Sequence, residues 1–173
     1  MKYTRIALMV ATVFVVAVVI HLELSRKKTG YVLINDLYSK FELQKEYTQK
    51  FERTKNERQK ILDSLAINLR ILANQIQEEK MKDKERIDAY NYQREAYLQK
   101  QKTFEEDNAQ LVKQYDEQIL NQLNQYVKEY GERNGYDYIF GNDGNGSLMY
   151  AYESDNVTPH VLSFINKKYQ GGE

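Results

Sequence analysis

The sequence predicts a mainly α-helical protein with a small β content. A long antiparallel helical hairpin is expected on a small β-sheet oligomerisation head, after an N-terminal membrane segment. The chief observation is that no glycine or proline lies between Gly30 and Gly131. Such a stretch, rich in Lys, Glu, Gln and Leu, is typical of long helices and cannot enclose one compact core. Short apolar runs and a glycine-rich turn flank this stretch, which indicates a small sheet.

Composition argues against several classes of function. The 173 residues include 25 basic and 25 acidic side chains, so no net charge attracts the chain to nucleic acid or to an anionic membrane. The absence of cysteine removes disulfides and thiolate chemistry. The two histidines, His21 and His160, are too scattered for a zinc site. We therefore expect a protein that is not an enzyme, with no cofactor, no metal, no nucleic-acid partner and no small-molecule substrate.

The N-terminal segment, residues 1–25, contains an apolar run from Ile6 to Ile20 that follows Lys2 and Arg5. The run is about 15 residues or ~22 Å of helix, and its flanking residues extend it toward the ~30 Å of a hydrocarbon core. No A-x-A pattern of small residues follows the run, so an uncleaved signal anchor is favoured over a cleaved signal peptide. A buried helix of a soluble protein is the third alternative. Basic residues on both sides leave the orientation open.

A short strand is the first element expected after this segment. The run from Tyr31 to Ile34 is apolar and β-branched, follows Gly30, and suits a buried strand. Asn35 or Asp36 then suits the cap of a helix that starts near Leu37.

Residues 37–133 carry a helical period and are expected to form the arm. Apolar residues step by three and four along both halves, which is the spacing of a packed seam. Between the halves, Glu78 to Glu85 is nearly all charged. A single helix of this length would span ~145 Å without sustained heptads at its ends, so we predict a hairpin with its tip near residues 82–88. The seam positions are Leu62, Leu65, Leu69, Leu72 and Ile76, then Ile87, Tyr90, Tyr97, Phe104, Asn108, Leu111, Tyr115, Ile119, Leu123, Tyr126 and Tyr130.

The chain after the arm predicts two strands and a final helix. Asp137 to Phe140 is typical of a strand, residues 141–146 are a dense turn cluster, and Leu148 to Ala151 is the returning strand. Thr158 and Pro159 suit the N-cap and first position of the last helix. Because a two-stranded hairpin is not stable alone, we expect the strand before the arm to be its third partner.

Residues 30–36 and 134–170 are therefore expected to form a β-rich head. Three short strands and one short helix make a thin core, so the head would gain from self-association and we expect an oligomer. The head residues that we expect to take part in oligomerisation are Tyr31, Val32, Leu33, Ile34, Tyr138, Ile139, Phe140, Leu148 and Tyr150.

These end segments resemble the Skp/OmpH family of periplasmic chaperones. The resemblance rests on residues 30–37, 135–140 and 148–151, and on Asn156 to Val161, which leads into the last helix. It covers nearly everything after the N-terminal segment, although the helical arms match only in character. Where the family has an Asp-Ile-Thr lead into its last helix, this chain has one residue inserted, as Asp155-Asn156-Val157-Thr158.

The resemblance implies a homotrimer whose helical hairpins project from a β-rich head and hold unfolded outer-membrane proteins between them, without ATP. It also implies a periplasmic location, either tethered to the inner membrane by the N-terminal segment or released after signal cleavage. The well-known members are strongly basic whereas this chain is neutral, so the resemblance alone does not predict an affinity for lipopolysaccharide.

A holdase needs many weak contacts, and the return arm near the tip offers candidates for client binding. Tyr90, Tyr92 and Tyr97 each combine an apolar face with a polar edge, and Met81 adds an adaptable contact. The alternative for each residue is packing of arm against arm. The predicted function is an ATP-independent holdase, with a membrane-anchored structural coiled-coil spacer or envelope assembly factor as the alternative.

Overall fold

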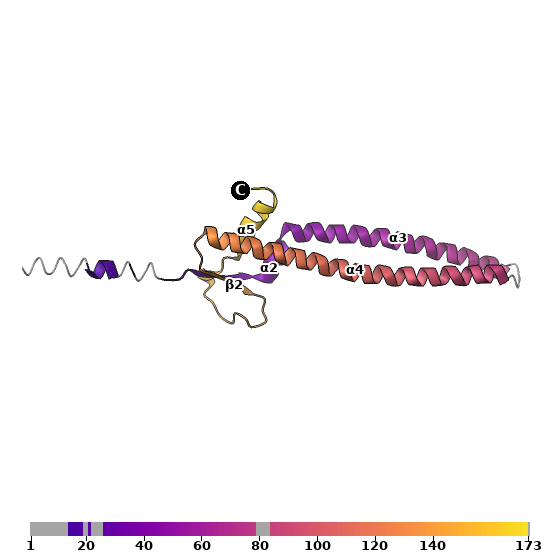
Figure 1. Cartoon of the computed structure of the whole chain (residues 1–173), viewed down its shortest axis with the longest axis horizontal. Helices are drawn as coiled ribbons and strands as arrows, with labels where there is room; N and C mark the ends of the chain where they lie inside the picture. The colour runs from indigo at the N-terminus through magenta and orange to yellow at the C-terminus, as the bar shows by residue number, and fades with distance from the viewer. Residues whose placement is uncertain (1–13, 19–20, 22–25, 79–83, 173) are drawn as a thin grey trace, which may run out of the picture.

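The computed structural model describes residues 14–18, 21, 26–78 and 84–172, and it shows an elongated molecule (Figure 1). Two long helices lie side by side and form a prong that projects from a small head (Figure 1). The elements are β1 (Thr29–Leu33), α2 (Ile34–Lys40), α3 (Glu42–Glu78), α4 (Lys84–Arg133), β2 (Tyr138–Asn142), the 3₁₀ helix η1 (Glu153–Asp155) and α5 (Thr158–Tyr169).

The prediction of a mainly helical protein with a small sheet is confirmed. The prediction of an N-terminal membrane segment, residues 1–25, falls mostly outside the described residues. In the part of the chain that the structure describes, no helix is long and apolar enough to cross a membrane.

The sheet contains two of the three expected strands and lacks the third. It has two strands, β1 and β2, which run parallel with Thr29 opposite Tyr138 and Leu33 opposite Asn142. The expected antiparallel partner, Leu148 to Ala151, is not a strand. The parallel direction of the two strands follows from helix length. Helix α4 has 50 residues and α3 has 37, so α4 continues ~20 Å past the start of α3. The chain then turns back and enters β2 in the direction of β1.

The turn after α4 is a Schellman motif, which closes the last turn of a helix through a residue in the left-handed conformation. Gly135 supplies that conformation with a φ of 67°. The N–H of Tyr136 donates to the carbonyl of Gly131 at 2.9 Å, and the N–H of Gly135 donates to that of Glu132 at 3.4 Å. The motif reverses the chain and directs it back into the sheet.

The other edge of β1 is covered by the segment that precedes α5. The carbonyl of Tyr31 accepts from the N–H of Val157, and the N–H of Leu33 donates to Thr158 Oγ1, both at 2.9 Å. Thr158 was expected to cap α5, but its hydroxyl supports the sheet and Val157 occupies the N-cap position. Asn156 Oδ1 accepts the N–H of Thr158 at 3.1 Å instead.

The first helix begins earlier than predicted and is interrupted. α2 starts at Ile34, directly after β1, and not near Leu37 behind a polar cap. At Phe41 the backbone becomes extended (ψ 131°), and α3 starts at the next residue. The Phe41 ring is fully buried and meets the rings of Tyr126 and Tyr169 edge-on at 6.1 and 5.6 Å. Burial of a phenyl ring is worth about 1.5–3 kcal/mol, which stabilises this break.

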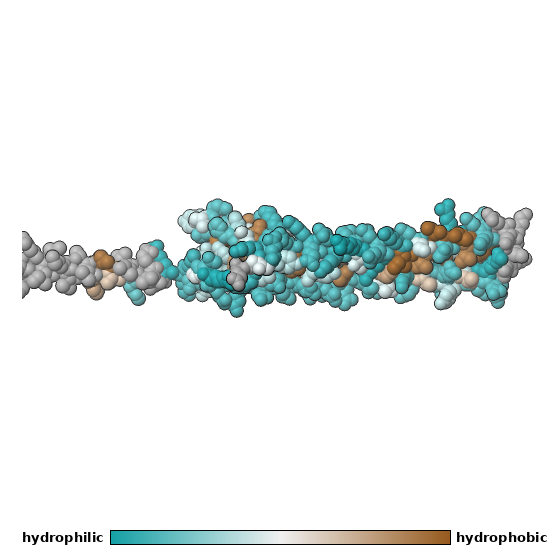
Figure 2. Space-filling view, turned by 90° about the horizontal axis from the view of Figure 1, so that it is seen from above, coloured by the Kyte–Doolittle hydropathy of each residue, from teal (hydrophilic) through white to brown (hydrophobic). Residues whose placement is uncertain are grey.

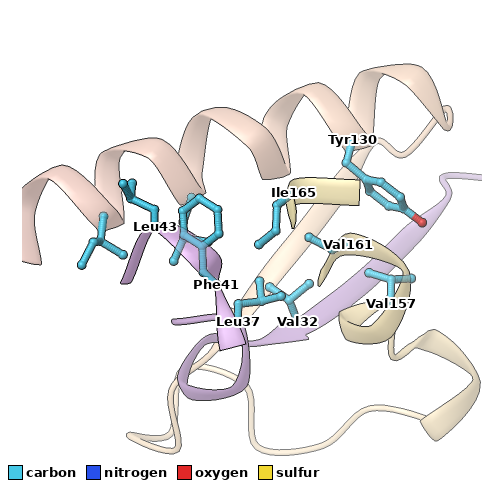
Figure 3. Packing of buried hydrophobic residues seen from close by; sticks show 10 residues of the cluster. Val32, Leu37, Phe41, Leu43, Tyr130, Val157, Val161 and Ile165 are labelled. Carbon is cyan, nitrogen blue, oxygen red and sulfur yellow. The ribbon is translucent and has the colours of Figure 1, made fainter. Parts of the chain in front are cut away.

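The hydrophobic core lies in the head, where α2, α5 and β1 gather against α4 (Figure 3). It joins residues from the two ends of the chain, so the head forms only when the prong has brought them together. The buried members are Val32, Leu37, Phe41, Leu43, Ile119, Leu123, Tyr130, Val157, Val161 and Ile165.

Candidate functional site

The prong is held together along the predicted seam. The five apolar seam positions on α3, from Leu62 to Ile76, are half-buried. The seam positions on α4 are half-buried or buried as well, except Ile87, which is 39% exposed. Because these residues face the partner helix, the outer faces of the prong remain open to solvent along its length.

A polar layer interrupts the seam midway along the prong. Arg58 Nη1 donates to Asn108 Oδ1, and Arg58 Nη2 lies 3.4 Å from the carboxylate of Asp107. The same guanidinium lies 5.3 Å from the ring centre of Phe104, which is a cation–π distance. The layer separates the distal leucine seam from the half of the prong that joins the head.

Aromatic contacts replace leucines in the half of the prong nearer the head. The rings of Tyr47 and Tyr115 stack with centroids 4.4 Å apart, and the Tyr47 hydroxyl donates to Gln118 Oε1 at 2.6 Å. The Tyr38 hydroxyl donates to the carboxylate of Asp116. Burial and this hydrogen bond raise the pKa of Tyr38 to about 12. Contacts of these tyrosines therefore join α2, α3 and α4 at the base of the prong.

Hydrogen bonds from α5 and the residue after it stabilise the start of α3. Asn166 Oδ1 accepts the N–H of Glu42 at 3.0 Å, and Asn166 Nδ2 donates to the carbonyl of Lys40 at 3.1 Å. One side chain thus satisfies a backbone group on each side of the break between α2 and α3. Gln170 Nε2 adds contacts of 2.8 Å to both carboxylate oxygens of Glu42.

Two carboxylates at the base of the prong are held in their ionised form. The hydrogen bond from Lys168 lowers the pKa of Glu129, with a further contribution from the charge of Arg133. The hydrogen bonds from Lys50 and from the Tyr169 hydroxyl lower the pKa of Glu46. These pairs connect α5 to both arms, since Glu46 lies on α3 and Glu129 on α4.

The residues predicted to contact clients divide into three groups. Tyr90 and Tyr97 are half-buried on the seam side of α4, which is the arm-against-arm alternative for these two residues. Tyr92 is 75% exposed and faces away from the seam. Met81 lies outside the described residues. A client contact at these positions stays a prediction.

The residues predicted for the oligomerisation head also divide by exposure. Tyr31 and Val32 are buried in the core, so their role within this chain is to hold the head together. Leu33, Ile34, Ile139 and Leu148 are half-buried. The exposed members are Tyr138 at 49%, Phe140 at 48% and Tyr150 at 75%.

Two further exposed side chains extend this face of the head and were missed by the sequence prediction. Met149 is 92% exposed and Tyr152 is 67% exposed. The ring of Tyr152 meets that of Tyr150 edge-on at 5.6 Å, and the rings of Tyr138 and Phe140 stack at 6.0 Å. The alternation of Leu148, Tyr150 and Tyr152 is the sequence signal that points to this face.

Apolar side chains off the seam form a second set that the sequence prediction missed. Ile67 and Ile71 on α3 are 60% and 49% exposed, and Leu98 on α4 is 48% exposed. Figure 2 shows hydrophobic side chains gathered over the half of the prong away from the head, whereas the half next to the head is mainly hydrophilic. The distal prong therefore offers apolar contacts to a partner in solution.

The side chains that could support chemistry are dispersed. Among residues 14–18, 21, 26–78 and 84–172, no group of three or more His, Cys, Asp or Glu side chains is placed to hold a metal ion. The hollow at the base of the prong, about 200 Å³, is lined mainly by the tyrosines and apolar residues that join the arms. The arrangement offers extended surfaces for polypeptide contact.

Comparison with known proteins gives one family. The family model described as "Outer membrane protein (OmpH-like)" matches residues 28–165, which covers the prong and most of the head. No curated protein matches the chain.

Proposed function

The chain belongs to the OmpH-like family, a family of periplasmic chaperones of outer-membrane proteins, and we propose that it acts as an ATP-independent holdase. The observation that supports this function best is the prong itself. It is long, open on its outer faces, and carries exposed apolar side chains over its distal half. Such a surface suits many weak contacts with an unfolded polypeptide.

A prong of this kind would suppress aggregation by occupying the apolar segments of a client before another client molecule reaches them. Its geometry also suits clients of different sizes. The distal prong has two helices and one seam, so few tertiary contacts oppose bending there. No step in this cycle needs nucleotide, because binding and release follow the balance between weak contacts and folding of the client.

The exposed aromatic face of the head supports self-association, for which we propose the homotrimer that the family resemblance implies. Tyr138, Phe140, Met149, Tyr150 and Tyr152 give this head an apolar surface at the sheet. Strand β2 pairs only with β1 among the described residues, so its other edge is open to pairing with another strand. An open edge and an apolar face are the two features that favour strand pairing between copies. Three prongs on one head would surround a shared space for a client.

The test is an aggregation assay. An outer-membrane β-barrel protein unfolded in urea is diluted into buffer at low salt and without nucleotide, and light scattering is recorded with and without one trimer per client. We expect the light scattering in the presence of the chain to be a small fraction of that of the client alone. An unrelated two-helix coiled coil at equal mass concentration is the control. Equal scattering with both proteins would reject the holdase and favour the structural spacer.

A further inference from the structure

The distal half of α3 differs in charge from the proximal half. Residues 42–60 contain ten charged side chains among 19, whereas residues 61–77 contain two among 17. A helix in a two-helix prong normally has a charged outer face, since that face contacts water. The distal half replaces those charges with isoleucine, alanine, asparagine and glutamine.

These uncharged residues form a stripe on one side of α3. Ser64, Ile67, Asn68, Ile71 and Gln75 follow the three- and four-residue spacing that places side chains on one helix face. All five are exposed, so the stripe lies outside the seam that Leu65, Leu69 and Leu72 form with α4. The stripe is therefore accessible to a partner.

An open hollow of about 310 Å³ lies where this stripe meets α4. Its lining has an aliphatic part and an amide part, and no charged residue. The lining residues are Asn68, Ile71, Leu72, Gln75 and Gln93.

The chemistry of this lining matches a polypeptide backbone. Each carboxamide offers both a donor and an acceptor, the same pair that a peptide unit needs. Ile71 and Leu72 provide apolar surface for a side chain that an extended segment directs toward the prong. Because none of the lining residues is charged, the hollow itself provides no ion-pair partner for an acidic or basic side chain.

We propose that this distal hollow is a binding site for extended, uncharged segments of an unfolded client, such as the transmembrane strands of a β-barrel protein. The proposal rests on the holdase function and adds the location and chemistry of the contact. The charge match favours this occupant, because strands that will face lipid lack charges. Backbone groups in such a segment are unpaired until the barrel folds, so they are free to pair with the carboxamides.

The area of the stripe argues against a second copy of this chain as its occupant. Two isoleucines, 60% and 49% exposed, and one open hollow offer only a small part of the about 800 Å² per partner that a stable interface buries. A contact of this size is weak and reversible. Weak contacts repeated on several prongs are what retention and release of one client require.

The first test compares Ile71→Gln with Leu120→Gln. The two side chains are 49% and 43% exposed, so both substitutions remove similar apolar surface. Leu120 lies on α4 in the half of the prong nearer the head and does not line the hollow. Binding of a urea-unfolded, fluorescently labelled β-barrel protein is measured by anisotropy. We expect Ile71→Gln to raise the Kd about fivefold or more and Leu120→Gln to raise it less than twofold.

A second pair tests the uncharged character of the hollow. Gln75→Glu places a negative charge in the hollow on a side chain of nearly the same size. Gln99→Glu makes the same change at an exposed position on α4 that does not line the hollow. We expect only Gln75→Glu to weaken binding, by about fivefold. Circular dichroism of all four variants should equal that of the unsubstituted chain.

The outcomes separate this proposal from the holdase function. If the unsubstituted chain does not bind the unfolded protein, the holdase function fails. If it binds and each hollow variant matches its control, the hollow is not the contact and the proposal fails. A loss at the hollow with intact binding in both controls supports the assignment.

Discussion

At the base of the prong, single side chains connect the helices of the prong to α5, and Glu129 is the clearest example. Its carboxylate contacts Lys168 on α5 and lies 2.9 Å from Arg133 on its own helix. The three side chains are partly exposed, so their interaction is screened by solvent and by salt. The pair nevertheless gives the head a contact between α4 and α5 that depends on protonation.

The lowered pKa of Glu129 predicts the sign of a pH effect. The ordinary pKa is 4.5, and the hydrogen bond from Lys168 lowers it in the folded state. The stabilisation is complete above the unfolded pKa and is lost as pH falls through the folded pKa. We expect the free energy of unfolding to fall between about pH 5 and pH 3. Urea titrations at both pH values measure it.

Lys168→Met is the matched variant for this effect. It removes the ammonium group that lowers the pKa, and the aliphatic part of the side chain is kept. We expect the variant to lose less stability than the unsubstituted chain over the same pH interval. An equal loss in both proteins would mean that Glu129 does not contribute through Lys168.

The sequence indicated which side chains would take part in caps and contacts, but several of the groups that they contact could not be predicted from it. Thr158 was expected at a helix cap because threonine suits that position, whereas its hydroxyl binds the N–H of Leu33, 125 residues away in sequence. Tyr90 and Tyr97 were expected at a client surface, and their helical spacing already placed them in the seam as well. Sequence fixes which groups need partners, and tertiary structure selects the partner.

At the level of elements, the break between α2 and α3 sets where the prong leaves the head. Two features maintain it: the buried ring of Phe41, and Asn166, which bonds the backbone on both sides. The helical period on either side gives no sign of the break, because Leu37 and Phe41 keep the seam spacing. The sequence therefore predicted one continuous helix from Leu37 to the tip.

Asn166→Ala tests this account of the break. The substitution removes the acceptor for the Glu42 N–H and the donor to the Lys40 carbonyl. We expect it to lower the free energy of unfolding by about 1–2 kcal/mol and the Tm by roughly 2–8 °C. Asn124→Ala, at an exposed position on α4, is the control and should change the Tm by less than about 1 °C. Equal shifts in both variants would contradict the bridging role of Asn166.

The seam is the element that sequence predicted best. Its positions follow from the period alone, and all but Ile87 are at least half-buried on both helices. Off-seam residues such as Ile67 and Ile71 carry no such signal, since a helix tolerates scattered apolar side chains. The structure shows what distinguishes Ile71, because its side chain lines the hollow between α3 and α4.

For the whole molecule, the order of the elements and the meeting of the strands before and after the prong were predictable, and the direction of that strand pair was not. The two apolar runs that became β1 and β2 lie at the ends of the prong in sequence, so their meeting follows from the hairpin. Their direction depends on how far α4 extends past α3, which no local pattern encodes. Leu148 to Ala151 has no strand partner among the residues that the structure describes.

The molecule is therefore a small head and a long prong that projects from it (Figure 1). The half of the prong away from the head carries the exposed apolar side chains (Figure 2). This separation matters for the proposed function. Self-association at the head leaves the distal prong free, so that one assembly presents several copies of the same weak site to one client.

The most direct test of this account is native mass spectrometry of the chain with an unfolded outer-membrane β-barrel protein. We predict a complex of three chains, each of 20.5 kDa, with one client molecule and without nucleotide. Addition of membrane vesicles should release the client and leave the trimer. A chain that stays monomeric, or a trimer that never retains the unfolded protein, would contradict the proposal that prongs on a shared head hold a client.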